Sequence, residues 1–463
     1  MKYDAIIIGA GLSGLAASIR LGHFGKKVLL LERHRQIGGL NSIYNRKGIV
    51  IDVGLHNITG FDPRSDKSRP LKKLVRYLRL DFDELRLVKQ KYSKIILNDI
   101  SLRFENSLDS LKESISRHFP PQIDNFNRLL VMIDSFDEDK LDNPKISAKQ
   151  MVRKVISDER LLNLLFLPVL LYGSPEENDI DFTSFVIIFK SIFYEGLGRP
   201  EGGMTHIIDI IKRRLEESHV DVRLKESVAH IETKDNKATG VVTTAGQRFE
   251  ADAILSSIGR FETMKLSDIL KSENDPALKI EAGSISFMET IHILDKTPSM
   301  LGEDVSTIFY SNNDIFSYQV PDDYVDQSSG VISFPDNFDY SKDYAGDERK
   351  FARITNIASY NKWSTLERSN YRDMKKHYES KTINELARHS IDIKDHISYT
   401  DSFTPVTVEK FTGHINGAVY GSPYKQFDGL SLIPNLYYIG TDQGYLGIIG
   451  AMLSGVIMAN KIL

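Results

Sequence analysis

The feature that most constrains this chain is its opening glycine pattern, Gly9-x-Gly11-x-x-Gly14. The pattern follows residues 4–8, whose short apolar run is typical of a fully buried strand. After it, apolar residues recur at helical spacing between residues 12 and 19. A glycine pattern alone is a weak signal, but this context predicts a strand, a tight turn and a helix.

A second apolar run, residues 28–32, completes a βαβ unit and implies a parallel sheet. Gly9 permits the tight turn, Gly11 lets the backbone approach a pyrophosphate, and Gly14 lets the helix and strand pack closely. The free N–H groups at the start of the helix favour an anion there. Glu32 ends the second strand, where its carboxylate accepts hydrogen bonds from a ribose and repels a 2′-phosphate. The unit predicts a dinucleotide site, against the alternative of a glycine-rich turn without a ligand.

Composition narrows the remaining function classes. The 463 residues include 59 basic and 63 acidic ones, so the chain lacks the positive surplus of a nucleic-acid binder. It has no cysteine, which excludes disulfides, thiolate metal sites and a redox dithiol, and suits a reducing cytoplasm. No metal-ligand spacing, nucleophile elbow or phosphate loop occurs. We therefore expect no metal site and no nucleic-acid partner.

Two stretches raise the question of membrane contact. No apolar run reaches about 18 residues, so we expect no transmembrane helix. Residues 161–172 form the longest candidate, which we interpret as a buried core segment broken or kinked at Pro168, with a surface-dipping helix as the alternative. Residues 64–117 carry 14 basic and 8 acidic residues. They are typical of solvated helix faces, or alternatively of a patch that meets anionic lipid.

The residues after Glu32 bear on which dinucleotide binds. Gly38-Gly39, followed by Leu40 and Asn41, would let the chain pass close to a long ligand running inward. This stretch resembles the corresponding motif of two-domain FAD oxidoreductases. Further matches follow in order along the chain: Asp52-Val53-Gly54-Leu55-His56, Arg199-Pro200-Glu201-Gly202-Gly203-Met204, Thr404-Pro405 with Gly417-Ala418-Val419-Tyr420-Gly421, and Asn435 to Asp442 with Gly447 to Gly455. Together they resemble the phytoene desaturase, carotenoid isomerase and retinol saturase branch of the FAD-dependent amine oxidase superfamily.

The resemblance implies an α/β fold with two interleaved domains. A Rossmann-type FAD-binding domain, of the two-domain glutathione reductase type, would comprise residues 1–60, 196–264 and 400–463. A mixed α+β substrate or lid domain would comprise residues 61–195 and 265–399. Residues 61–190 and 265–395 match the branch only in general character.

The resemblance also implies which residues touch FAD, and the lack of cysteine implies that FAD is held noncovalently. The implied contacts are Gly9, Gly11, Ser13 and Gly14 at the pyrophosphate; Glu32 and Arg33 at the adenosine; Gly39, Leu40 and Asn41 along the path to the flavin; His56 and Asn57 near the isoalloxazine; Val228 at the adenine; Asp442 at the ribityl–pyrophosphate region; and Ile449, Gly450 and Ala451 at the N1–C2=O edge. His56 has the alternative of capping or packing, and Asp442 that of a helix N-cap. No catalytic residue is nominated.

The implied function is an FAD-dependent oxidoreductase acting on a small apolar substrate, a polyene or isoprenoid-like compound, by desaturation, saturation or double-bond isomerisation. The alternatives are a flavin amine oxidase and a nonenzymatic lipid carrier on the same fold. We expect the chain in the cytoplasm, with peripheral contact to the inner face of a membrane as the alternative. The sequence leaves the oligomeric state open.

Overall fold

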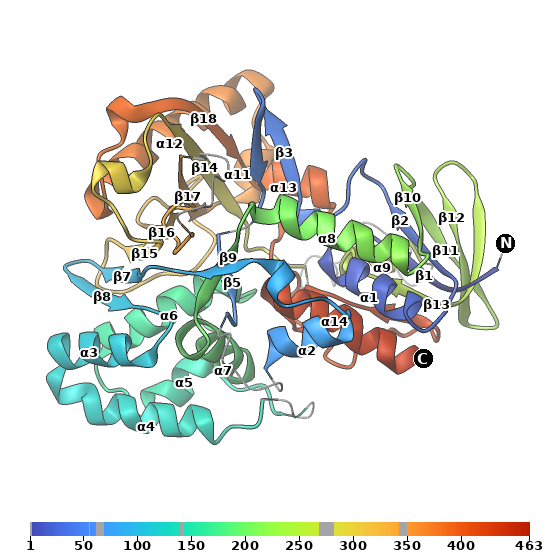
Figure 1. Cartoon of the computed structure of the whole chain (residues 1–463), viewed down its shortest axis with the longest axis horizontal. Helices are drawn as coiled ribbons and strands as arrows, with labels where there is room; N and C mark the ends of the chain where they lie inside the picture. The colour runs from blue at the N-terminus through green and yellow to red at the C-terminus, as the bar shows by residue number, and fades with distance from the viewer. Residues whose placement is uncertain are drawn as a thin grey trace.

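The computed structural model describes residues 2–54, 56–61, 69–138, 140, 143–267, 282–341 and 350–463. Leu55 and residues 64–68, which belong to stretches discussed above, lie outside the described residues. Two seven-stranded sheets organise the fold, and they lie beside each other in Figure 1, the first on the right and the second on the left. Within the described part of the chain, no helix is both long and apolar enough to cross a membrane.

The first sheet contains the predicted βαβ unit. Its order is β10-β2-β1-β13-β12-β11, with β19 also paired to β13. The pairs β10–β2, β2–β1, β1–β13 and β13–β19 are parallel, which confirms the predicted parallel sheet, while β11 to β13 form an antiparallel meander. The strands are β1 (Lys2–Ile8), β2 (Val28–Glu32), β10 (Asp221–Leu224), β11 (Val228–Lys234), β12 (Lys237–Thr243), β13 (Arg248–Ser256) and β19 (Leu436–Tyr438).

Helices from both ends of the chain meet on this sheet. Helix α1 (Leu12–Gly22) packs along α14 (Gly447–Ile462), and α8 (Gly203–Glu217) joins the same apolar cluster. The contact between α1 and α14 is close because Gly455 has no side chain: a Cβ there would lie 2.0 Å from the Ser13 carbonyl oxygen. The C-terminal helix is therefore fixed beside the glycine turn.

The second sheet has the order β18-β14-β17-β16-β15-β7-β8. Figure 1 shows α3 to α7 gathered below it and α11 and α12 above it. Its strands are β7 (Ser93–Leu97), β8 (Ile100–Phe104), β14 (Phe287–Leu294), β15 (Thr307–Ser311), β16 (Ser329–Ser333), β17 (Phe351–Ile357) and β18 (Ile397–Phe403). The helices are α3 (Leu108–His118), α4 (Ile123–Asp134), α5 (Ala148–Arg153), α6 (Glu159–Gly173), α7 (Phe182–Phe189), α11 (Tyr360–Ser364) and α12 (Arg368–His389).

Short elements connect the two sheets. The hairpin of β3 (Ile43–Arg46) and β4 (Ile49–Asp52) and the small sheet of β5 (Ile58–Thr59), β9 (Leu197–Pro200) and β6 (Leu87–Lys89) lie between them. Helix α2 (Pro70–Tyr77) packs on α14. The remaining helices that matter for the site are α9 (Arg260–Lys265) and α13 (Pro405–Thr412).

Helix α6 contains the apolar stretch predicted to be core. The Asp158 carboxylate caps its start by accepting hydrogen bonds from two backbone N–H groups. Residues 161–171 are all buried, so the core interpretation is confirmed, and the helix continues through Pro168. Asn163 is the polar exception; its amide donates to the Glu159 carbonyl and accepts from the Phe316 N–H. Every polar atom that this residue brings into the core therefore has a partner.

We propose that the two sheets mark the two domains expected from the sequence, with residues 1–60, 196–264 and 400–463 on one side and 61–195 and 265–399 on the other. The first sheet draws all its strands from the former ranges. The boundary near residue 400 falls inside β18, which pairs along its whole length with the second sheet. We therefore place that boundary after Phe403.

Candidate cofactor and active site

A cavity of about 700 Å³ opens where the glycine turn, the end of β2 and segment 407–415 come together. This volume falls within the roughly 300–1,000 Å³ typical of small-molecule sites. Most of the residues predicted to touch a dinucleotide line it: Gly9, Gly11, Ser13, Glu32, Arg33, Gly39, Leu40, Asn41, Val228 and Ala451. Residues more than 400 positions apart in the chain thus share one wall.

The glycine turn provides the floor of this cavity. Gly14 lies so close to the turn that a Cβ would come within 2.1 Å of the Gly9 carbonyl oxygen. At Gly11, by contrast, a Cβ would meet no atom within 4 Å, because this residue faces the cavity. Helix α1 begins directly after Gly11, and no described side chain caps it. Its first N–H groups therefore remain available to an anion in the cavity.

Glu32 braces the turn from the end of β2. One carboxylate oxygen accepts the Ala10 N–H at 2.7 Å, and the other accepts the His34 N–H at 2.8 Å. The side chain is buried but still lines the cavity. Because each carboxylate oxygen can accept two hydrogen bonds, Glu32 can hold the turn and a ligand hydroxyl together.

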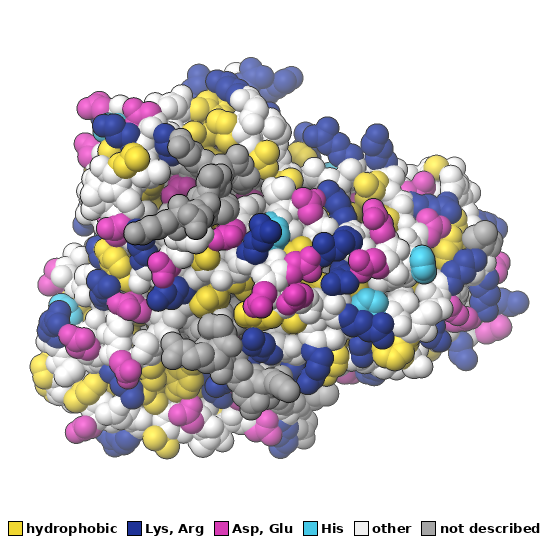
Figure 2. All heavy atoms as spheres, viewed as in Figure 1, with side chains coloured by type: hydrophobic (Ala, Val, Ile, Leu, Met, Phe, Trp, Pro, Cys, Tyr) yellow, Lys and Arg dark blue, Asp and Glu magenta, His cyan; other side chains and the backbone are white. Residues whose placement is uncertain are grey.

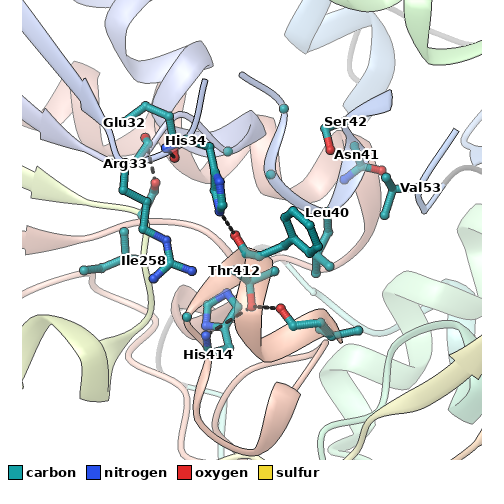
Figure 3. A pocket seen from close by; sticks show the side chains of 18 of the residues that line it. Glu32, Arg33, His34, Leu40, Asn41, Ser42, Val53, Ile258, Thr412 and His414 are labelled. Carbon is teal, nitrogen blue, oxygen red and sulfur yellow. Dashed lines mark hydrogen bonds between the residues drawn. The ribbon is translucent and has the colours of Figure 1, made fainter. Parts of the chain in front are cut away.

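The opposite wall comes from the end of α13. The Arg33 guanidinium donates to the Lys410 carbonyl at 3.1 Å, and the His34 Nε2 lies 2.5 Å from the Phe411 carbonyl oxygen. The His34 and Phe411 rings also stack, with centroids 5.5 Å apart. In Figure 3, Glu32, Arg33 and His34 face Thr412 and His414 across the opening. We call residues 410–414 the strap.

A partly buried contact between His414 and Glu262 fixes the base of the strap. The His414 Nδ1 lies 3.6 Å from a Glu262 carboxylate oxygen, which also accepts the Ile415 N–H at 2.8 Å. Burial alone would lower the pKa of His414, but the hydrogen bond and charge of Glu262 outweigh it and leave the pKa raised. The strap is thereby tied to α9 on one side and to β2 on the other.

Sequence reasoning missed the strap. The only local signals are the residues at the two ends of α13. Thr404 is its N-cap and Pro405 its first residue, and Gly413, with φ of +80°, ends it. These residues predict a helix of the observed length. Nothing in the linear sequence says that this helix ends beside Arg33, because that contact depends on how two distant segments pack.

Several predicted residues lie outside the cavity wall: Gly14, His56, Asn57, Asp442, Ile449 and Gly450. Gly14 underlies the turn, and Ile449 and Gly450 lie in the first turn of α14, next to Ala451 in the wall. Asp442 is buried, and its two oxygens accept the Arg260 N–H at 2.6 Å and the Ser422 N–H at 2.8 Å. It therefore accepts a backbone N–H at the start of α9 from a distant segment, while Gly259 holds the N-cap position of that helix, so Asp442 is not itself an N-cap.

His56 and Asn57 point toward the second sheet. The His56 ring is held between the Ser333 hydroxyl at 2.7 Å and the Thr355 hydroxyl at 3.1 Å. Burial, followed by the charges of two nearby arginines, lowers the pKa of His56 well below its usual value, so the ring is neutral. Asn57 donates to the Thr307 hydroxyl at 3.0 Å. The structure does not bring these two side chains together with the glycine turn.

The fold is that of a known class of flavoproteins. Solved structures that align over almost the whole chain include an oxidoreductase from Methanosarcina mazei, with a TM-score of 0.68, 16% identity and full coverage of both chains. They also include putrescine oxidase bound to putrescine, with a TM-score of 0.64, 17% identity and coverage of 100% of this chain and 99% of that one. At such identities the likeness shows the fold alone, a two-domain FAD-binding α/β fold, which confirms the fold class.

Sequence comparison then identifies the family. Residues 12–282 match the family described as flavin containing amine oxidoreductase, and the chain belongs to this family. Prolycopene isomerase 2, chloroplastic, of an Oncidium hybrid cultivar is 23% identical over 100% of this chain and 84% of its own length. All-trans-retinol 13,14-reductase of Danio rerio is 24% identical over 99% and 86%. The 4,4'-diaponeurosporene oxygenase of Staphylococcus aureus is 23% identical over 100% and 98%. The chain is an FAD-dependent oxidoreductase of the carotenoid-related branch.

The residues of the cavity fit FAD. The open space beside Gly11 and the uncapped start of α1 suit a pyrophosphate. The Glu32 carboxylate lies at the strand end where a ribose is bound in this fold. Val228 and Ile258 add apolar surface for a base. The cavity therefore has, one after another along its wall, residues suited to the pyrophosphate, the ribose and the adenine of FAD.

Replacing Phe411 with alanine is expected to speed FAD dissociation about fivefold, because the His34 stack that holds the strap closed contributes about 1 kcal/mol. Exchange of bound FAD for excess isotopically labelled FAD measures the rate. Phe24→Ala is the matched control, since Phe24 is similarly exposed, at 52% against 56%, and lies outside the cavity wall. Equal release rates for both variants would show that the strap does not retain FAD.

Proposed function

We propose that this enzyme binds FAD in the cavity described above and acts on an apolar polyene or isoprenoid-like substrate, by desaturation, saturation or double-bond isomerisation. The relatives named for prolycopene, retinol and diaponeurosporene cover 99–100% of this chain. We infer the substrate class from those names and from the apolar side chains at one end of the cavity.

The observation that carries the proposal is the position of Val419. This side chain lines the cavity and also packs on the large apolar cluster formed by α3 to α7 and the second sheet. Beside it, the Tyr420 ring meets the Phe287 ring edge-on at 5.7 Å, and its hydroxyl donates to the Leu171 carbonyl at 2.6 Å. The inner end of the cavity therefore borders an aromatic and aliphatic region, which suits a hydrocarbon chain.

The start of α14 faces the same region. The Tyr172 ring lies 3.2 Å from where a Gly447 Cβ would be, and the Leu446 side chain lies against Gly173. No described side chain caps α14, so its first N–H groups stay available to negative charge. When bound, FAD supplies hydride transfer at N5. The chain's own part is to hold the cofactor, orient an apolar substrate beside it and exclude water.

A flavin amine oxidase is the second candidate, favoured by the family description and by the fold it shares with putrescine oxidase. The one tryptophan, Trp363, does not support an aromatic cage at the cavity. It is buried among Tyr324, Tyr371 and Tyr378, and its indole N–H donates to the Tyr324 carbonyl at 3.0 Å. Since the chain is an enzyme of this family, the lipid-carrier alternative falls away.

We propose, in addition, peripheral contact with a membrane from the cytoplasmic side, because an apolar substrate resides there. Support comes from segment 424–432, where Phe427 and Leu430 are exposed and Leu432 is 83% exposed. The basic stretch gives less support, since several of its exposed cations pair with carboxylates, as in Arg117–Glu113. On the face shown in Figure 2, basic and acidic side chains are intermixed.

The test is anaerobic spectroscopy of the purified holoenzyme with substrates supplied in liposomes. Acyclic carotenoids and retinol are mixed with the oxidised enzyme, and the flavin absorbance near 450 nm is followed while the polyene is analysed by chromatography. We expect at least one polyene to bleach the flavin, or to be reduced or isomerised by the prereduced enzyme. Putrescine and other primary amines form the second arm.

Bleaching by amines, with peroxide release in air and no change in any polyene, would overturn the substrate assignment in favour of an amine oxidase. The Gly11→Val variant described below is the matched control, since it removes the pyrophosphate space without touching the apolar region. Polyene turnover that persists in that variant would show that the reaction does not depend on this cavity.

A further inference from the structure

The segment that follows the hairpin β3–β4 closes one end of the cavity. The Val53 N–H donates to the Ser42 carbonyl at 3.0 Å, and Val53 lines the cavity. A Cβ on Gly54 would lie 2.6 Å from the Leu40 carbonyl oxygen, so this backbone rests directly on the Gly39–Asn41 turn. Figure 3 shows Leu40, Asn41 and Val53 together at this end. Residues 52–54 thus close the end of the cavity beside the Gly39–Asn41 turn.

Two buried arginines hold this segment. From β17 of the second sheet, the Arg353 Nη2 donates to the carbonyls of Asp52 at 3.1 Å and Val53 at 2.8 Å. From β9, the Arg199 Nη1 donates to the His56 carbonyl at 3.2 Å, and its Nη2 donates to the Asp52 carboxylate at 2.5 Å. The two arginines come from different parts of the chain, yet both donate to backbone carbonyls of one short segment, Arg353 to those of Asp52 and Val53 and Arg199 to that of His56.

The two positive charges are balanced inside the fold. Arg353 pairs with Glu289 of β14, and Arg199 pairs with Asp52. All four side chains are at most 5% exposed. A buried ion pair gives little net stability compared with apolar side chains of similar size, because both ions lose their hydration. Since these pairs add little to the free energy of unfolding, we attribute their presence to the backbone geometry that the two arginines impose on the segment around Val53.

We propose that Arg199 and Arg353 are positioning residues that fix residues 52–54 against the Gly39–Asn41 turn, so that the second sheet sets the position of this wall of the FAD cavity. This inference rests on the proposed site for FAD. A guanidinium is required because its planar fork donates to backbone carbonyls, two for Arg353 and one for Arg199, while it pairs with a carboxylate. An ammonium group at the same place keeps the charge but loses this geometry.

The test compares Arg353→Lys with His292→Gln. His292 lies on β14, as Glu289 does, and is fully buried, with its ring nitrogens on the Thr400 and Thr382 hydroxyls and not on the carbonyls of Asp52, Val53 or His56. Hydrogen exchange of the Val53 amide is measured in FAD-free protein, and the FAD dissociation constant is measured by fluorescence quenching. We expect Arg353→Lys to speed exchange at Val53 and to weaken FAD binding about tenfold. We expect His292→Gln to change neither, even where it lowers the melting temperature.

Equal exchange at Val53 and equal FAD affinity in the two variants would overturn the proposal. If Arg353→Lys does not fold, Arg199→Lys gives the same reading, since it loses the His56 carbonyl contact without altering the second sheet. The exchange measurement needs no cofactor. If the Val53 amide exchanges no faster in Arg353→Lys than in the wild type, the positioning role of Arg353 is wrong. If the wild-type protein does not bind FAD, the proposed site is wrong instead.

Discussion

A Gly11→Val variant is expected to fold normally and to lose FAD binding by at least about 100-fold. Gly11 has φ of −69° and ψ of 170°, an extended conformation that valine adopts without strain. A Cβ there meets no protein atom within 4 Å, so the added side chain projects into the cavity. It would occupy the space in which a pyrophosphate approaches the start of α1. Isothermal titration of the flavin-free protein with FAD measures the effect, and thermal unfolding without FAD checks the fold.

Gly25→Ala is the matched control for that variant. Gly25 also has open space around its Cα, but its φ of +71° makes alanine strained, and it lies at the far end of α1, outside the cavity wall. We expect this control to lose some stability and to keep its FAD affinity. Tight FAD binding by Gly11→Val would mean that the pyrophosphate lies elsewhere.

A Glu32→Ala variant is expected to weaken FAD binding about 100-fold and to destabilise the flavin-free protein by about 2–4 kcal/mol, because the carboxylate makes two charge-assisted hydrogen bonds to backbone N–H groups. One of these, to Ala10, holds the glycine turn itself. Glu32→Gln keeps one acceptor oxygen and should lose about half as much. Urea unfolding and FAD titration together separate the two effects.

Asp4→Ala controls for the general loss of a carboxylate in the same βαβ unit. Asp4 also accepts a backbone N–H, that of Lys27 at 2.6 Å, but at an exposed position outside the cavity. We expect a small loss of stability and no change in FAD affinity. If Glu32→Ala binds FAD as tightly as Asp4→Ala does, the ribose role of Glu32 is wrong.

The cofactor end of the fold could be predicted because its chemistry is local. The turn from Gly9 to Gly14 and the acid at the end of β2 lie within about thirty residues, and Gly14 packs against the Gly9 carbonyl oxygen inside the same turn. The apolar helix around Pro168 was equally accessible, because continuous hydrophobicity predicts burial whatever surrounds it. In these segments local pattern and tertiary structure agree.

The strap and the backbone contacts of Arg199 and Arg353 could not be predicted in the same way. The strap meets Arg33 and His34 across about 377 residues of chain, and Arg353 meets Val53 across about 300. A lone histidine or arginine in a sequence does not indicate which carbonyl it will meet. His56 illustrates the difference: its motif predicts proximity to the flavin, but its ring turns to two hydroxyls of the second sheet. Its role as a flavin contact stays a prediction.

The most direct test of the central claim is an experimental structure of the enzyme purified with FAD. We expect the pyrophosphate beside Gly11 at the start of α1, the adenosine between Glu32 and the strap, and the ring system near Val419 and the first turn of α14. Density for FAD in any other cavity, or a flavin ring that faces charged side chains in place of the apolar region, would contradict it.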